Sequence, residues 1–92
     1  MNKPELFRMD GFDDCILGIV AGPNCPEAVC YDIDLVLQKL QDDMDMTRDE
    51  AIEFFEFNMR DASVGKGTPV FMRWADIKTI EALLDRDDLK NN

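Results

Sequence analysis

The sequence predicts a single α+β domain over residues 1–92, with a small three-stranded antiparallel sheet packed by two to three helices in the order β-β-α-α-β-α. Three observations support this prediction. Short apolar runs are bounded by Gly, Pro and Asn residues, as is typical of strands. Three longer segments repeat apolar residues at helical spacing. The chain has 92 residues, of which 46% are apolar, and this suffices for one core but not two.

The first expected elements form a β-hairpin over residues 14–31. Residues 1–10 lack a clear period and are expected to be a lead-in segment. The apolar run 15–20 indicates a mostly buried strand, and a stretch rich in Gly, Pro and Asn at 21–26 interrupts it. Residues 28–31 then predict the returning strand.

A first helix is expected directly after the hairpin. Asp32 can cap it, and Asp34 falls in its first turn, where the helix dipole favours a negative charge. The apolar positions form one stripe, made of Ile33, Val36, Leu37, Leu40 and Met44.

The second helix has the clearest start signal in the chain. Thr47 and Glu50 have the spacing of a capping box, in which each side chain accepts a hydrogen bond from the other residue's amide. Its predicted core stripe consists of Ala51, Ile52, Phe55 and Met59.

Two aromatic residues of the second helix do not fit that stripe. Phe54 lies on its shoulder, and Phe57 points to the polar side. We expect the returning chain to cover Phe57. The alternative is an exposed aromatic ring among carboxylates, a composition typical of protein-binding hot spots.

A loop over residues 64–68, a third strand over 69–74 and a last helix complete the prediction. Pro69 at the start of the strand favours an edge position, and Asp76 can cap the helix. Residues 85–92 are expected to fray. The apolar face of the last helix consists of Ile77, Ile80, Leu83 and Leu84.

The charge of the chain is strongly negative and unevenly distributed. Twenty acidic and ten basic residues give a net charge of −10. Residues 27–56 hold ten acids and two bases, whereas the rest of the chain from Phe57 onward is neutral. An acidic surface repels nucleic acid and attracts basic protein surfaces, so we expect a protein partner and no direct binding of nucleic acid.

Several kinds of chemistry find no support in the sequence. There is no histidine, which excludes nucleophile–histidine pairs. The three cysteines form no CxxC pair, so we expect buried or free thiols and neither metal nor cofactor. The segment 65–68 has the wrong spacing for a phosphate-binding loop. We find no signal peptide and no stretch long enough to span a membrane, and expect a cytoplasmic protein.

The motifs resemble a family of small acidic proteins of bacteriophages, prophages and other bacterial mobile elements. The resemblance covers roughly residues 11–71 and rests on GFDDCILGIV (11–20), MTRDEAIEFFEFN (46–58) and VGKGTPVF (64–71). The chain departs from the family pattern at Asp61 and Ser63. The matching positions are Asp13, Asp14, Tyr31, Asp32, Glu50, Phe55, Phe57, Asn58, Gly65, Thr68 and Pro69. The resemblance implies no reaction and no cofactor. It implies a phage-like setting, in which small acidic proteins often inhibit host machinery, including as anti-CRISPR proteins.

Three functional hypotheses follow. The first is a non-enzymatic inhibitor in the host bacterial cytoplasm whose acidic face blocks a basic site on a nucleic-acid-binding complex. Its expected partner-binding residues are Asp42, Asp43, Asp45, Asp49, Glu50, Glu53, Glu56 and Phe57. The second is a binding module, or a homodimer, that docks through an apolar patch around Phe57 or Trp74. The third is a small metal-dependent enzyme with a carboxylate cluster built on Asp10, Asp13, Asp14 and Asp32.

Overall fold

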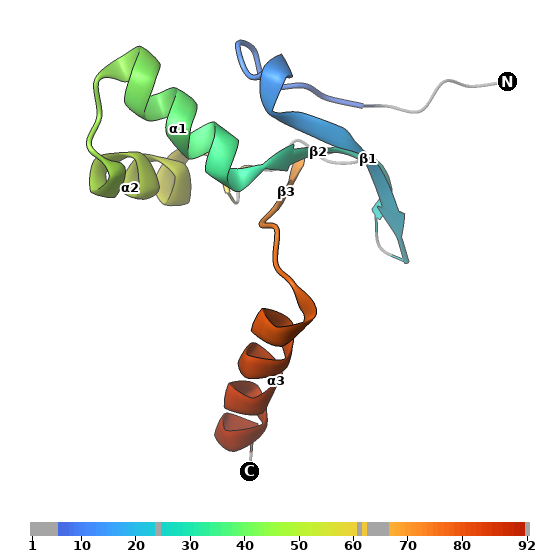
Figure 1. The fold of residues 1–92 in the computed structure, drawn as a ribbon. Coiled ribbons are helices and arrows are strands. Elements are labelled where there is room, and N and C mark those ends of the chain that lie inside the picture. The colour runs from blue at the N-terminus through green and yellow to red at the C-terminus, as the bar shows by residue number, and fades with distance from the viewer. Residues whose placement is uncertain (1–5, 24, 61, 63–66, 92) are drawn as a thin grey trace, which may run out of the picture.

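A computed structural model describes residues 6–23, 25–60, 62 and 67–91 of the chain, and it confirms the α+β class and the predicted order of elements. Two strands, β1 (Ile16–Gly22) and β2 (Cys25–Asp32), form the expected hairpin, and a short 3-10 turn (Asp13–Cys15) precedes them. Helices α1 (Ile33–Met44) and α2 (Arg48–Asn58) follow, then strand β3 (Val70–Met72) and helix α3 (Ile77–Asn91). Figure 1 shows α1 and α2 on one side of the sheet and α3 projecting from it.

The sheet is mixed, so the prediction of a purely antiparallel sheet is wrong for its last strand. The strand order is β1-β2-β3, with β1 antiparallel to β2 and β3 parallel to it. A parallel neighbour requires a crossover from one end of the sheet to the other. Helices α1 and α2 and the segment after Asn58 give the chain the length to make it. The edge position that Pro69 predicts for β3 is confirmed.

The starts of the helices follow the sequence signals. The Asp32 carboxylate accepts a hydrogen bond of 3.2 Å from the Leu35 amide at the start of α1. The capping box of α2 is present, with Thr47 Oγ1 accepting from the Glu50 amide at 3.2 Å and Glu50 Oε1 accepting from the Thr47 amide at 2.8 Å. Helix α1 ends at Met44, and Asp45 adopts a left-handed conformation that aspartate tolerates better than most residues.

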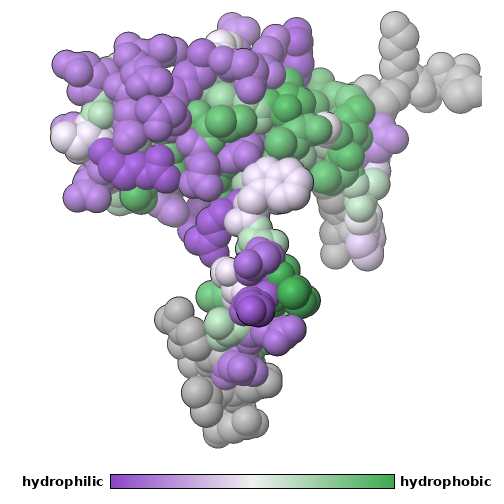
Figure 2. Space-filling view, in the orientation of Figure 1, coloured by the Kyte–Doolittle hydropathy of each residue, from purple (hydrophilic) through white to green (hydrophobic). Residues whose placement is uncertain are grey.

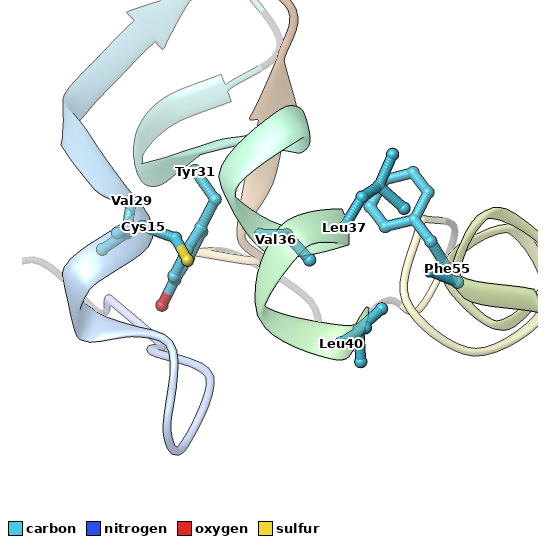
Figure 3. Close-up of a cluster of buried hydrophobic side chains, with 8 residues drawn as sticks. Cys15, Val29, Tyr31, Val36, Leu37, Leu40 and Phe55 are labelled. Carbon is cyan, nitrogen blue, oxygen red and sulfur yellow. The ribbon is translucent and has the colours of Figure 1, made fainter. Parts of the chain in front are cut away.

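One buried cluster joins the hairpin to α1 and α2. Tyr31 is its centre and is fully buried, and its hydroxyl accepts a hydrogen bond of 2.7 Å from the Met9 amide. The Phe55 ring meets the Phe71 ring edge-on, with centroids 4.9 Å apart, so α2 also packs on β3. In Figure 3, Val36 faces Tyr31, and Leu37 and Leu40 turn toward α2. The buried members are Cys15, Val29, Tyr31, Val36, Leu37, Leu40, Ala51 and Phe55.

Four of the predicted apolar segments are less buried than the sequence indicates. The expectation of a mostly buried first strand is wrong, because Leu17, Ile19 and Val20 of β1 are exposed. Met44, the last residue of α1, and Ile52, at the margin of the α2 stripe, are exposed. The apolar face of α3 is exposed throughout, and α3 continues as a helix to Asn91, across most of the stretch 85–92 that is expected to fray. No helix in the described part of the chain is both long and apolar enough to cross a bilayer.

Candidate interaction surface

The acidic residues predicted to bind a partner lie on the two packed helices and on the turn between them. Figure 2 shows mostly hydrophilic residues where α1 and α2 lie and hydrophobic residues gathered toward the sheet. All seven carboxylate side chains are exposed; they belong to Asp42, Asp43, Asp45, Asp49, Glu50, Glu53 and Glu56. These seven acids differ in whether their carboxylates already have ion-pair or hydrogen-bond partners within the chain.

The acids at the end of α1 are engaged by neighbouring side chains. Lys39 Nζ lies 3.5 Å from Asp43 and 3.3 Å from Asp14, so it bridges α1 to the turn before β1. The hydrogen bond to Asp14 raises the pKa of Lys39 above its ordinary value and holds its positive charge. Gln38 donates a hydrogen bond of 3.1 Å to Asp42. These groups line an open pocket of about 190 Å³, which is partly neutralised and is therefore a weaker anchor for a basic partner than the sequence indicates.

Two acids of α2 are also occupied. Arg60 Nη1 lies 2.8 Å from Glu56 Oε2 in an i,i+4 pair. Glu50 turns back to cap its own helix at Thr47. The regular row of Glu50, Glu53 and Glu56 that the spacing suggests is thus not a row of free carboxylates.

Three of the seven acids have neither an ion-pair nor a hydrogen-bond partner for their carboxylates among the residues that the structure describes. None of the ion pairs formed within these residues involves Asp45, Asp49 or Glu53. Asp49 and Glu53 are four residues apart on α2, so they lie on one face about 6 Å apart along the axis. Asp45 lies in the turn that leads into this helix. These three residues are called the α2 acidic surface below.

Phe57 is exposed, and the expectation that the returning chain covers it is wrong. Its side chain is 82% accessible, more than any other large apolar residue of the described chain. Phe57 and Glu53 are four residues apart on the same helix and are surface neighbours. The ring therefore extends the α2 acidic surface with an apolar contact.

Trp74 is exposed as well, at 67%, but it belongs to a different part of the fold. It lies between β3 and α3, whereas Phe57 lies on α2. The two exposed aromatic residues named for the apolar patch therefore belong to different elements. Sequence reasoning predicted the helix after Trp74 correctly but not the exposure of its apolar face.

The carboxylates proposed for a metal-dependent enzyme are held apart by different partners. Asp13 pairs with Arg8 at 3.0 Å, Asp14 pairs with Lys39, and Asp32 caps α1. In the described ranges, no three potential ligands lie close enough together to hold a metal ion. The segment 65–66, weighed as part of a phosphate-binding loop, lies outside the described residues, as do Asp61 and Ser63.

Cys15 and Cys30 are free thiols inside the fold. Burial raises the pKa of both thiols, and nearby Asp14 adds to the shift at Cys15. A thiol with a raised pKa is a weak nucleophile at neutral pH. Both residues therefore act as core side chains.

Searches of protein-family models, curated proteins and solved structures return no match to this chain.

Proposed function

We propose that this protein is a non-enzymatic interaction protein that binds a basic surface of a nucleic-acid-binding complex, and that the α2 acidic surface makes the contact. The observation that carries the proposal is the group Asp45, Asp49 and Glu53, which is exposed and has no basic partner in the described chain. A setting inside a bacterial host, with the protein acting as a phage-type inhibitor such as an anti-CRISPR protein, follows from the resemblance given above.

The physical basis is competition for a site built for phosphates. A groove that binds nucleic acid presents Lys and Arg side chains at the spacing of phosphates. Carboxylates fixed on a helix can occupy such a groove without an ordering cost for the backbone, because α2 is already capped and packed. The net charge of −10 also speeds encounter with a basic partner.

Phe57 can supply the binding affinity that exposed charges alone do not provide. Exposed ion pairs contribute little affinity because water and salt screen them. A large aromatic ring that is buried on binding is the usual energetic centre of an interface, with polar residues around it. We expect Phe57 to anchor the complex and the acids to select and steer the partner.

The test compares two matched pairs of neutralising substitutions in the full chain. The first variant carries Asp49→Asn with Glu53→Gln. The control carries Glu81→Gln with Asp85→Asn on α3. Both remove one Asp and one Glu four residues apart on an exposed helix face, so both change the net charge by the same amount. Each chain is immobilised, incubated with a nuclease-treated bacterial lysate, and its captured proteins are quantified.

We expect the wild type and the control to capture the same nucleic-acid-binding proteins and the first variant to lose them. Capture should fall steeply between about 50 and 200 mM salt, and added DNA or RNA should compete with it. Equal loss of capture in both variants would mean that capture depends on the net charge of the chain and not on the α2 acidic surface. Capture that ignores salt and competitor would contradict the proposal.

A separate substitution tests the role of Phe57. Phe57→Ser removes an 82% accessible ring, so the fold should be retained, as circular dichroism can verify. If Phe57→Ser abolishes capture while the acid variant and salt leave it unchanged, binding is apolar and the acids serve only to keep the chain from self-associating.

A further inference from the structure

Helix α3 carries an apolar stripe that none of the described segments covers. At about 100° per residue, Ile77, Ile80, Leu83 and Leu84 fall within roughly 120° of its circumference. All four side chains are exposed, and Ile77 is 65% accessible. Figure 1 shows the helix extending away from the sheet, and Figure 2 shows hydrophobic residues along one side of it.

A helix of this kind is not stable by itself in water. Helix α3 has 15 residues, and an isolated helix of about that length is only marginally formed unless its apolar face is packed. Its first turn is well made, since Asp76 Oδ1 accepts a hydrogen bond of 2.8 Å from the Thr79 amide. A cap fixes where the helix begins, but it does not bury the stripe. Helix α3 is therefore expected to be stable only when its apolar stripe packs against another surface.

The chain exposes more surface than a compact monomer of its size. The protein exposes 7227 Å², whereas a compact monomer of its size exposes about 5,500 Å². Its radius of gyration is 15.3 Å, against about 12 Å for a compact chain of this length. The excess of roughly 1,700 Å² belongs to the whole chain and not to α3 alone, and it is larger than the 800 Å² or so that each partner buries in a standard interface.

Charge favours a second copy of this chain as the occupant. Helix α3 contains four acids and three bases, so it accounts for −1 of the net charge of −10. A basic partner would be drawn to the acidic α1–α2 region instead. Two copies that meet along α3 bring together the helices with the smallest net charge, since α1 and α2 carry −2 and −3.

We propose that α3, with Trp74 at its base, is a self-association element that pairs two copies of this chain through the stripe of Ile77, Ile80, Leu83 and Leu84. A two-fold pair of this kind is isologous, so the same face of each copy is buried. This inference is independent of the partner proposed for the α2 acidic surface.

The mass of the full chain in solution tests the inference. We expect sedimentation velocity to show a dimer that dissociates on dilution. Trp74 is the only tryptophan, and its fluorescence should shift to shorter wavelength as the chain concentration rises. Raising the salt should preserve or tighten the dimer because it screens like charges, which is the opposite of its effect on a complex with a basic partner.

Two glutamine substitutions on opposite faces of α3 provide the matched control. Leu84→Gln removes part of the stripe from both copies and should weaken the dimer on the order of 100-fold. Ala82→Gln, about 160° around the helix, should leave it unchanged. A chain that is monomeric at every concentration overturns the inference. So does equal behaviour of the two variants, and so does a short-wavelength Trp74 emission that dilution does not change, which would mean that α3 packs on its own body.

Discussion

Helices α1 and α3 both follow an aspartate that caps the first turn, and both carry an apolar stripe at helical spacing. The Asp32 carboxylate accepts from the Leu35 amide, and the Asp76 carboxylate accepts from the Thr79 amide. The stripe of α1 is buried, with Leu40 only 1% accessible, whereas every residue of α3 whose side chain is described is exposed.

The difference lies in what adjoins each helix. Helix α1 starts directly after β2 and is followed within three residues by α2, so its stripe contacts both. Helix α3 is joined to β3 by the exposed residues 73–76 and makes no comparable contact with another element in the described chain. Amphipathic periodicity therefore specifies a helix and the face that must be covered. Whether that face is covered depends on which elements the chain places next to the helix.

The largest expected effect is a difference in the free energy of unfolding between a substitution in the α1 stripe and one in the α3 stripe. Leu40→Ala should lower the free energy of unfolding by about 2–5 kcal/mol, because it leaves a cavity in the core. Leu84→Ala should change it by no more than about 0.5 kcal/mol in a dilute, monomeric sample. Urea denaturation followed by circular dichroism measures both values. Similar losses for the two variants would mean that α3 packs on the body of the fold, which consists of the sheet, α1 and α2.

A smaller effect is expected at the capping box of α2. Thr47→Ala removes the acceptor for the Glu50 amide and should lower the stability of the body by about 1 kcal/mol. Thr47→Ser keeps the hydroxyl and should restore most of the loss. Chemical denaturation of the three chains gives the comparison, and a destabilised serine variant would assign the effect to packing of the threonine methyl group instead.

The smallest effect concerns the start of α3 and depends on pH. The hydrogen bond from the Thr79 amide lowers the pKa of Asp76 below its ordinary value of 3.8. A lowered pKa means that the ionised cap stabilises α3 at pH values above 3.8 and that this support is lost as the pH falls through the lowered value. The helical signal of α3 should decline there.

Asp76→Asn isolates this contribution, because asparagine also caps helices but does not titrate. Far-UV circular dichroism of the wild type and the variant through the acid range should show a small extra loss of helix in the wild type only. Coincident curves would show that the cap does not govern α3.

Sequence patterns anticipated much of the body because their signals are local. The capping box at Thr47, the cap at Asp32 and the edge position of Pro69 each depend on residues a few positions apart. The direction of β3 depends on where the chain returns after α1 and α2, and no local pattern encodes that.

The candidate surface was less predictable for the same reason. The exposure of Phe57 depends on which other segments pack on α2, and the helical periodicity of α2 does not encode that. Lys39 pairs with Asp14, which lies 25 residues earlier in the chain. A count of charges along the sequence could not show that Lys39 is shared between Asp14 and Asp43. Only Asp45, Asp49 and Glu53 of that group have carboxylates without a hydrogen-bond or ion-pair partner among the described residues.

The parallel pairing of β3 has a consequence for how the chain assembles. Val70 lies opposite Cys30, so this strand closes a loop of some forty residues, at an entropic cost that grows with the logarithm of loop length. Packing α2 against α1 first shortens the effective loop. We therefore expect the hairpin and the two helices to form early and β3 to join last. Since β3 is also the attachment point of α3, the body is complete before its projecting helix is held in place.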